Sequence, residues 1–178
     1  MKEMIICFGI VALLSCNSDK DKKAEPENPA TTTANTPTDL PYKASYTSNW
    51  TTDVSDADLK TVLQSYKDWA DGNMTALETA FADTVDVEMN SGDHLHNSKG
   101  DLMKFWGTYR DSLSSVTIDM EAWHKMYATD KKEGYIITWY KETDTYKTGK
   151  VDSARYHDIN QVKDGKIVWY SQYKRPLK

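Results

Sequence analysis

Cysteine is almost absent from this chain. Its only two cysteines, Cys7 and Cys16, both lie near the start of the 178 residues. The rest of the sequence therefore has no thiol for a disulfide, for a Cys-ligated metal or for a cysteine nucleophile. Long apolar runs are equally scarce, because the single one, residues 4–14, is too short to span a bilayer. A domain in this chain must be held together by its hydrophobic core, and its length permits such a core.

Other absences narrow the chemistry. The sequence has no Gly-rich phosphate loop and no Gly-x-Ser-x-Gly nucleophile elbow. Its net charge of -5 argues against nucleic acid as a partner, and the basic pairs at 131–132 and 174–175 are isolated. We therefore predict no nucleic-acid binding and no cofactor.

The N-terminus has the pattern of an export signal. A short charged start precedes the apolar run, which ends in Leu13-Leu14-Ser15-Cys16 and is followed at once by polar residues. This stretch resembles a bacterial lipoprotein signal, which implies cleavage before Cys16 and lipidation of that cysteine. The implied location is the bacterial cell envelope, at the outer membrane. An ordinary secretory signal or an uncleaved anchor helix is the alternative.

Composition divides the chain into three parts. Four of the five prolines fall between residues 17 and 49, in a segment rich in Asp, Lys, Glu and Thr that cannot bury a core. We predict a signal peptide over 1–15, the lipidated Cys16 with a disordered linker over 16–50, and one domain over 51–178. The alternative for the linker is a structured arm, in which Tyr42, Tyr46 and Trp50 pack on the domain as a strand or strap.

Helical periodicity dominates the first half of the domain. A helix is predicted from a cap at Ser55 or Asp56 to the stop at 71–72, and a shorter one over 73–82 with Met74, Leu77 and Phe81 on one face. Ser98 and Asp101 have capping-box spacing and open a third helix that extends to about residue 113.

Period-two alternation dominates the second half. Residues 84–90 form a first strand, and after residue 114 four further strands follow at 116–128, around 135–139, 154–162 and 167–173. Tyr135, Ile137 and Trp139 define the second of these four. The predicted fold class is α+β, with a curved antiparallel meander that follows three helices.

Several segments in this order resemble one fold family. They are the Trp69–Asn73 loop, the Phe81–Val85 strand entry, the strand from Gly134 to Trp139, and the hairpin that runs from His157-Asp158-Ile159 to 164–167. Together they resemble the nuclear transport factor 2-like cone, in its SnoaL-like branch, over residues 58–175. The resemblance implies a curved sheet wrapped on three helices, a pocket between them, and pairing of two copies through the sheet.

The aromatic residues favour a pocket that binds ligands. The chain has six tryptophans and eleven tyrosines but three phenylalanines, so most of its aromatic rings carry a polar atom. Such rings suit pocket walls and interfaces. We predict that a small, partly apolar molecule binds there. Its predicted contacts are Trp69, His94, Trp106, Tyr109, Trp139, Tyr156 and Asn160.

The resemblance also implies an enzymatic alternative. Small enzymes of this family use Asp or His as a general base, so an isomerase, cyclase or hydratase would use Asp158, which falls on the family's Asp, or His124, on the apolar face of its strand. Asn160, in place of an aromatic residue, argues against cyclase activity. His157 and Asp158 point to opposite faces of a strand, and the family match favours Asp158 as the inward residue.

Two further alternatives remain. His94 and His96 form a His-x-His pair that in a strand would begin a metal site, with His124 or Asp86 as a further ligand. Their turn-rich surroundings favour a surface loop, so we predict no metal and place His94 at the pocket rim. The last alternative is a protein interaction module that works through the outer face of the sheet.

Overall fold

The computed structural model describes residues 40–42, 44–46 and 48–177. The chain divides into two units at Lys43/Ala44, and the second unit, Ala44–Lys178, holds every helix and strand discussed below. The predicted signal peptide and Cys16 lie outside the described residues. In the described part, no helix has both the length and the apolar character needed to cross a membrane.

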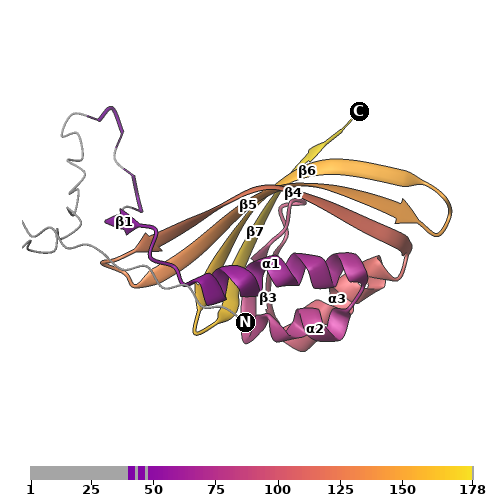
Figure 1. Ribbon diagram of the computed structural model, residues 1–178, viewed down its shortest axis with the longest axis horizontal. Helices are drawn as coiled ribbons and strands as arrows, with labels where there is room; N and C mark the ends of the chain where they lie inside the picture. Colours follow the sequence, from indigo (N-terminus) through magenta and orange to yellow (C-terminus); the bar gives the residue numbers. More distant parts are fainter. Residues whose placement is uncertain (1–39, 43, 47, 178) are drawn as a thin grey trace, which may run out of the picture. The chain divides into compact units, whose positions relative to one another are not determined.

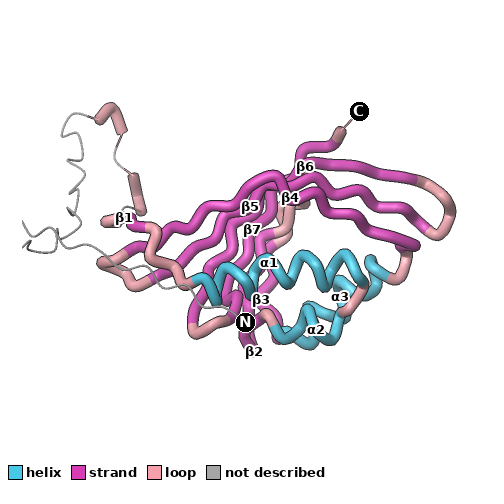
Figure 2. Tube along the Cα trace, viewed as in Figure 1, coloured by secondary structure: helices cyan, strands magenta, loops and turns pink. Residues whose placement is uncertain are grey.

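One seven-stranded sheet forms the domain, in the order β1-β4-β5-β6-β7-β2-β3 (Figures 1 and 2). Its strands are β1 (Trp50–Thr51), β2 (Phe81–Glu88), β3 (His94–Ser98), β4 (Leu113–Ala128), β5 (Glu133–Tyr146), β6 (Val151–Lys163) and β7 (Lys166–Pro176). β4 to β7 form the predicted antiparallel meander, and β2 joins it by pairing parallel to β7. The predicted α+β class is confirmed.

Irregularities in the strand pairing accompany the curvature of the sheet. The register shifts between Leu113 and Ser115 and between Met120 and Ala122 on β4, and between Gln161 and Val162 on β6. Such bulges bend a strand and increase its twist. The sheet arches over α1 (Asp56–Asp71), α2 (Met74–Thr79) and α3 (Lys99–Arg110), so the helices lie on its concave side (Figure 1).

Helix α1 begins and ends where the sequence predicts. The Ser55 hydroxyl accepts a hydrogen bond from the Asp58 amide at 3.0 Å, and the helix ends at Gly72 with φ of 74°. Arg110 of α3 donates from Nε and Nη2 to the carbonyls of Trp69 and Ala70, both at 3.0 Å. A Cβ at Gly72 would lie 3.0 Å from this guanidinium, so glycine permits both the turn and the contact.

Two segments differ from the prediction. Helix α2 ends at Thr79, because Phe81 already pairs with Ile167 of β7 and begins β2 rather than completing a helical face. Residues 94–98, predicted as a loop, form β3 against β2. In this five-residue strand Leu95 is the one apolar residue, which is too little alternation for the strand to be recognised from sequence.

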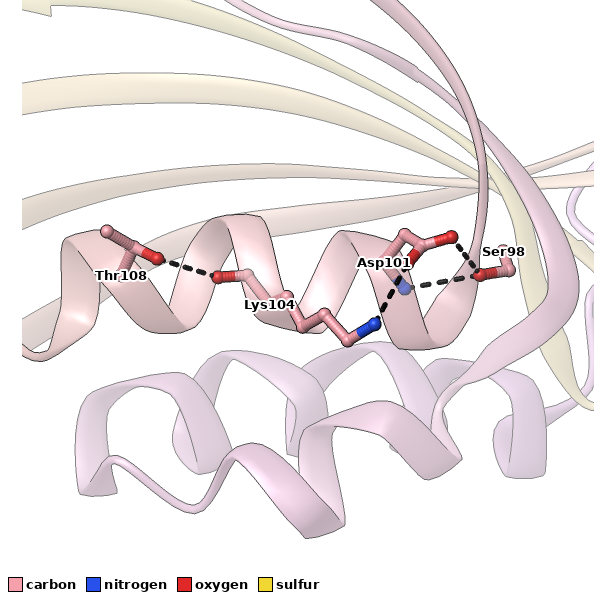
Figure 3. A network of polar contacts seen from close by, with 4 residues as sticks. All are labelled: Ser98, Asp101, Lys104 and Thr108. Carbon is pink, nitrogen blue, oxygen red and sulfur yellow. Dashed lines mark hydrogen bonds and ion pairs between the residues drawn. The ribbon is translucent and has the colours of Figure 1, made fainter.

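The predicted start of α3, with Ser98 as its N-cap, is confirmed (Figure 3). Ser98 Oγ accepts from the Asp101 amide at 3.2 Å and donates to the Asp101 carboxylate at 2.8 Å. Lys104 Nζ reaches the same carboxylate at 3.2 Å, one turn later. The first turn of α3 is thereby fixed directly after β3.

The segment before α1 crosses the β4–β5 end of the sheet as an arm. Trp50 and Thr51 of β1 pair with Ala128 and Tyr127 of β4. The Tyr46 hydroxyl donates to Glu133, and the Trp50 ring lies 6.1 Å from that of Tyr135. These described residues form the structured arm that the sequence left as the alternative, whereas Tyr42 is exposed.

The apolar core lies between the helices and the sheet. Val62 of α1 and Leu102 of α3 meet Val85, Ile136 and Ile167 of the sheet, and all five are fully buried. Gly134 lets the chain before α1 approach β5, since a Cβ there would lie 3.4 Å from Val54 Cγ2 and 3.2 Å from Val162 Cγ2.

Candidate functional site

A cavity of about 320 Å³ lies between the concave face of the sheet and the helices. Nine of its lining residues are aromatic, namely Tyr66, Trp69, Phe81, Phe105, Trp106, Tyr109, Tyr140, Tyr156 and Tyr170. Leu77 and Met89 add apolar surface, and the polar lining residues are Ser65, Asn90, Glu142, Asn160, Gln172 and Lys174. The cavity is thus mostly aromatic, with a few polar groups, as in sites that bind small organic molecules.

Strand register places the inward side chains in rows across three strands. Thr138, Asp158 and Gln172 form one row across β5, β6 and β7. The next rows are Ile136, Asn160 and Tyr170 on one side and Tyr140, Tyr156 and Lys174 on the other. Asp158 therefore occupies the centre of the concave face.

Three tyrosine hydroxyls converge on this central carboxyl. Tyr140 of β5, Tyr170 of β7 and Tyr66 of α1 donate to Asp158 Oδ2 at 2.8, 2.9 and 3.0 Å. The Tyr66 hydroxyl also lies 2.8 Å from Thr138 Oγ1 and accepts from Asn160 Nδ2 at 3.1 Å. The cluster ties α1 to three adjacent strands.

Asp158 lies behind the cavity wall rather than in it. It is 0% exposed and does not line the cavity, whereas the three tyrosines do. Burial raises the pKa of its carboxyl to about 7, against the opposing effect of the tyrosine hydrogen bonds. Its Oδ1 has no hydrogen-bond partner within the described part of the chain.

A chain of hydrogen bonds connects this cluster with the surface. The Asn90 amide donates to Gln172 Oε1, and Gln172 Nε2 donates to the Tyr170 hydroxyl at 2.6 Å. Tyr170 in turn donates to Asp158. Because Asn90 is exposed and lines the cavity, this series of hydrogen bonds leads from the solvent to the buried carboxyl of Asp158.

Glu142 is the carboxylic acid that lines the cavity. Its residue is 8% exposed, and Trp69 Nε1 donates to its Oε2 at 3.2 Å. Burial raises the pKa of Glu142 to about 8, and the charges of Asp144 and Asp158 act in the same direction. An acid that titrates near neutral pH in a cavity wall can bind, donate or accept a proton there.

The aromatic lining is organised by ring contacts. Trp69 and Tyr109 stack with centroids 6.2 Å apart, and Tyr140 and Tyr156 stack at 5.2 Å. Trp106 packs edge to face on Phe81 and Tyr170 at 5.3 and 6.0 Å. Such contacts hold the rings in place, so the cavity has a defined wall.

Most of the predicted contact residues lie together. Trp69, Trp106, Tyr109, Tyr156 and Asn160 all line the cavity. His94 lies outside it, in an adjoining depression that shares Met89, Asn90, Gln172 and Lys174 with the cavity. The lining is therefore assembled from α1, α3, β6 and neighbouring elements.

The structure corrects the placement of His124 and Trp139. The bulge between Met120 and Ala122 reverses the alternation of β4, so His124 pairs with Ile137 on the convex face and is exposed. Trp139 also lies on the convex face, where it stacks on His157 at 5.0 Å. Neither residue lines the cavity.

The His-x-His pair lies on an exposed strand. His96 Nδ1 is 2.6 Å and His94 Nε2 is 3.6 Å from Asp86 Oδ1 on β2. His124, proposed from the sequence as a further ligand, lies on β4, outside this group. Among the described residues, no group of three His, Cys, Asp or Glu side chains is placed to hold a metal ion.

Sequence reasoning missed several central residues. Tyr140 and Glu142 are missed because the prediction places Trp139 in the pocket, which turns the alternate residues of β5 away from it. Their own alternation with Ile136 and Thr138 was the available signal. Tyr66 lies within the first predicted helix, but no sequence feature pairs its hydroxyl with Asp158.

Comparison with known proteins identifies one family. The family model of the SnoaL-like domain matches residues 62–170, more than half of the chain. The comparison with curated proteins found no match.

Solved structures share the architecture at low sequence identity. An LEH-like epoxide hydrolase from M. tuberculosis has a TM-score of 0.58 at 8% identity, covering 68% of this chain and 84% of that one. An NTF2-like protein of unknown function from Burkholderia pseudomallei gives 0.57 at 12%, covering 68% and 92%. A putative SnoaL-like polyketide cyclase from Jannaschia sp. gives 0.55 at 10%, covering 70% and 89%. The predicted nuclear transport factor 2-like fold is confirmed.

The buried Asp158 should make stability depend on pH. Because its folded pKa of about 7 exceeds the ordinary 3.8, the folded protein keeps a proton that the unfolded chain has lost between these values. Stability should therefore fall as pH rises through this window, by at most about 1.4 kcal/mol per unit. Urea unfolding between pH 4.5 and 8 should show a shallower fall for Asp158→Asn. Asp119→Asn, at an exposed position, is the control, and equal slopes in the wild type and Asp158→Asn would contradict the assignment.

Proposed function

This chain belongs to the SnoaL-like domain family, and we propose that its cavity binds a small, partly apolar organic molecule. The observation that carries the proposal is the hollow itself: about 320 Å³ bounded mainly by aromatic rings. This volume is within the range of small-molecule sites, which bury most of an apolar ligand and orient it by a few polar groups. Here Glu142, Asn160 and Gln172 supply such groups.

The position of two aromatic rings also favours entry of a ligand from the solvent into the cavity. Phe105 and Tyr109 of α3 line the cavity and are 52% and 39% exposed, so they mark a side that is open to solvent. A ligand that covers these rings gains free energy from apolar surface removed from water. Asn90, exposed and also in the lining, lies at the same cavity.

Ligand binding should raise the melting temperature. The neutral bicyclic alcohol 2-naphthylmethanol, at about a hundred times its Kd, should raise Tm by about 5 °C in differential scanning fluorimetry. Trp106→Ala, which removes a ring of the lining, should abolish this rise. Trp139→Ala is the matched control, because its ring lies on the convex face, and should keep it.

Two results would contradict this proposal. One is the absence of any shift with 2-naphthylmethanol and with its amine analogue, 2-naphthylmethylamine, in a folded wild-type protein. The other is a shift that Trp139→Ala removes and Trp106→Ala leaves intact, since the probe would then bind the convex face.

A second candidate function is proton transfer next to a carbonyl group. Glu142 favours it, because a cavity carboxyl with a pKa of about 8 is suited to act as a general base near neutral pH. Lys174, also in the lining, would stabilise the oxyanion that forms. Asp158 does not line the cavity, so it would act by positioning the tyrosines that donate hydrogen bonds to it. His124, which also lies outside the cavity, would take no part.

Exchange of acidic carbon-bound protons tests this candidate. If Glu142 is a general base, the protein should accelerate exchange of deuterium into the α positions of 2-tetralone above the buffer rate, as followed by proton NMR. Glu142→Gln should lose about a hundredfold of the acceleration, and Glu121→Gln, at an exposed ion pair with Arg155, should lose none. Exchange at the buffer rate in the wild type would remove the candidate.

We also propose that the protein is exported and held in the cell envelope, at the outer membrane, by lipid on Cys16. The support is the sequence Leu13-Leu14-Ser15-Cys16 after a short apolar run. Multiple acyl chains on one cysteine provide durable anchoring, because each buried methylene adds to the binding free energy.

Fractionation of a Gram-negative host that expresses the full chain tests the anchor. The wild type should sediment with the membranes, and Cys16→Ser should move most of the protein out of the membrane fraction. Cys7→Ser is the matched control, because Cys7 lies in the predicted signal peptide, and should leave the distribution unchanged. Membrane association that survives Cys16→Ser would contradict lipidation at this residue.

The convex face would serve the predicted pairing of two copies. Trp139 stacks on His157, whose ring lies 5.9 Å from that of Tyr173, and Tyr173 is 57% exposed. These rings, together with Ile137 and Ile159 in a neighbouring row of the same face, would supply apolar contact area. The same surface would serve the interaction module that the sequence left as an alternative.

A further inference from the structure

Glu142 is a buried acid whose carboxyl accepts few hydrogen bonds from the protein. Trp69 Nε1 makes the only hydrogen bond to its carboxyl within the described part of the chain, and it does so to Oε2 alone. The residue is 8% exposed and lines the cavity. Its second oxygen, Oε1, is therefore available to a ligand that brings a donor.

The charged groups around Glu142 are mostly acidic. Asp144 follows on the same face of β5, and Asp158 lies on the same concave face, two rows away on β6. Both raise the pKa of Glu142, so their negative charge acts at its carboxyl. A cation placed beside Glu142 would experience favourable interactions with all three carboxyl groups.

The nearby cations have other partners. Lys174 of β7 lies 3.7 Å from Asp152 and 5.6 Å from the centre of the Tyr156 ring. Arg110 of α3 donates to two backbone carbonyls at the end of α1. The Lys174 charge lowers the pKa of Glu142, but neither Lys174 nor Arg110 gives this carboxyl a hydrogen bond or an ion pair.

Aromatic rings complete the surroundings. Trp69 both donates to Glu142 and stacks on Tyr109, and the Tyr140–Tyr156 stack starts one row away on the same face. All four rings line the cavity. Ring faces attract ammonium groups, most strongly where water is excluded. Carboxylate and ring faces together form a setting that suits an organic cation.

We propose that the ligand of this cavity is an amine with an apolar or aromatic body, and that its ammonium group binds Glu142 while the body lies against the aromatic wall. This inference rests on the proposed binding function and narrows it to one ligand class. An anion would face the Glu142 carboxyl in the cavity wall, where the charges of Asp144 and Asp158 also act. A purely apolar molecule would leave the Glu142 carboxyl without a new partner.

Proton release gives this proposal a distinctive signature. Burial and the neighbouring acids hold the pKa of Glu142 at about 8 in the unliganded cavity, so below that pH its carboxyl carries a proton. An ammonium ligand needs the ionised form and expels that proton. Affinity for the amine should therefore rise between pH 6 and 8, by at most about tenfold per unit. A ligand that accepts a hydrogen bond from the protonated acid would show the opposite slope.

The experiment compares two probes of nearly equal shape on the full chain by isothermal titration calorimetry. At pH 7.5, 2-naphthylmethylamine should bind about tenfold more tightly than 2-naphthylmethanol. Glu142→Gln should reduce the amine to the affinity of the alcohol, leave the alcohol within about twofold, and remove the pH slope. Glu121→Gln, at an exposed ion pair, should change neither probe.

Each outcome has one meaning. If the alcohol binds but the amine binds no more tightly, the inference is overturned and the binding function stands. An amine preference that persists in Glu142→Gln also overturns it. If neither probe binds, the binding function fails and the inference with it. Should Glu142→Gln fold poorly by circular dichroism, the wild-type slope decides, since a rise toward pH 8 supports the inference and a flat or falling profile overturns it.

Discussion

One buried carboxyl oxygen connects the two layers of this domain. Asp158 lies on β6, and its Oδ2 accepts hydrogen bonds from tyrosines on α1, β5 and β7. A single atom therefore links the helical layer to three adjacent strands, β5, β6 and β7. Because each hydroxyl points back to Asp158, the rings of these tyrosines are left to form the cavity wall. The shape of the cavity therefore depends on this polar centre as well as on apolar packing.

This arrangement carries an energetic cost that its hydrogen bonds offset. A carboxyl at 0% exposure loses its hydration, and the raised pKa records that loss. The three hydroxyls, which would themselves be unsatisfied without an acceptor, recover part of it. An apolar residue at this position would remove the common acceptor, and the tyrosines would then have no shared partner to fix their orientation. Buried polarity here serves the definition of a cavity.

The sequence predicts local features of this domain better than long-range ones. The Ser55 and Ser98 caps, the Gly72 stop and the four-strand meander follow from short patterns, and the structure confirms them. The inward face of β5 does not follow, because both of its alternating sets contain aromatic and aliphatic residues. The bulge in β4 that turns His124 outward leaves no mark in the local pattern. The contacts of Glu142 and Asp158 depend on strand register, which only the assembled sheet defines.

The arm before α1 determines where a mechanical load would enter the domain. Beyond the two-residue pairing of β1 with β4, it is fastened by Ser48 to Asp130, by Asn49 to Thr129 and by Tyr46 to Glu133, all at the β4–β5 turn. Tension along the residues that precede it would be borne first by these polar fastenings, whereas the tyrosine cluster lies on the middle rows of the sheet. The arm would therefore detach from the β4–β5 turn before the load distorted the cavity.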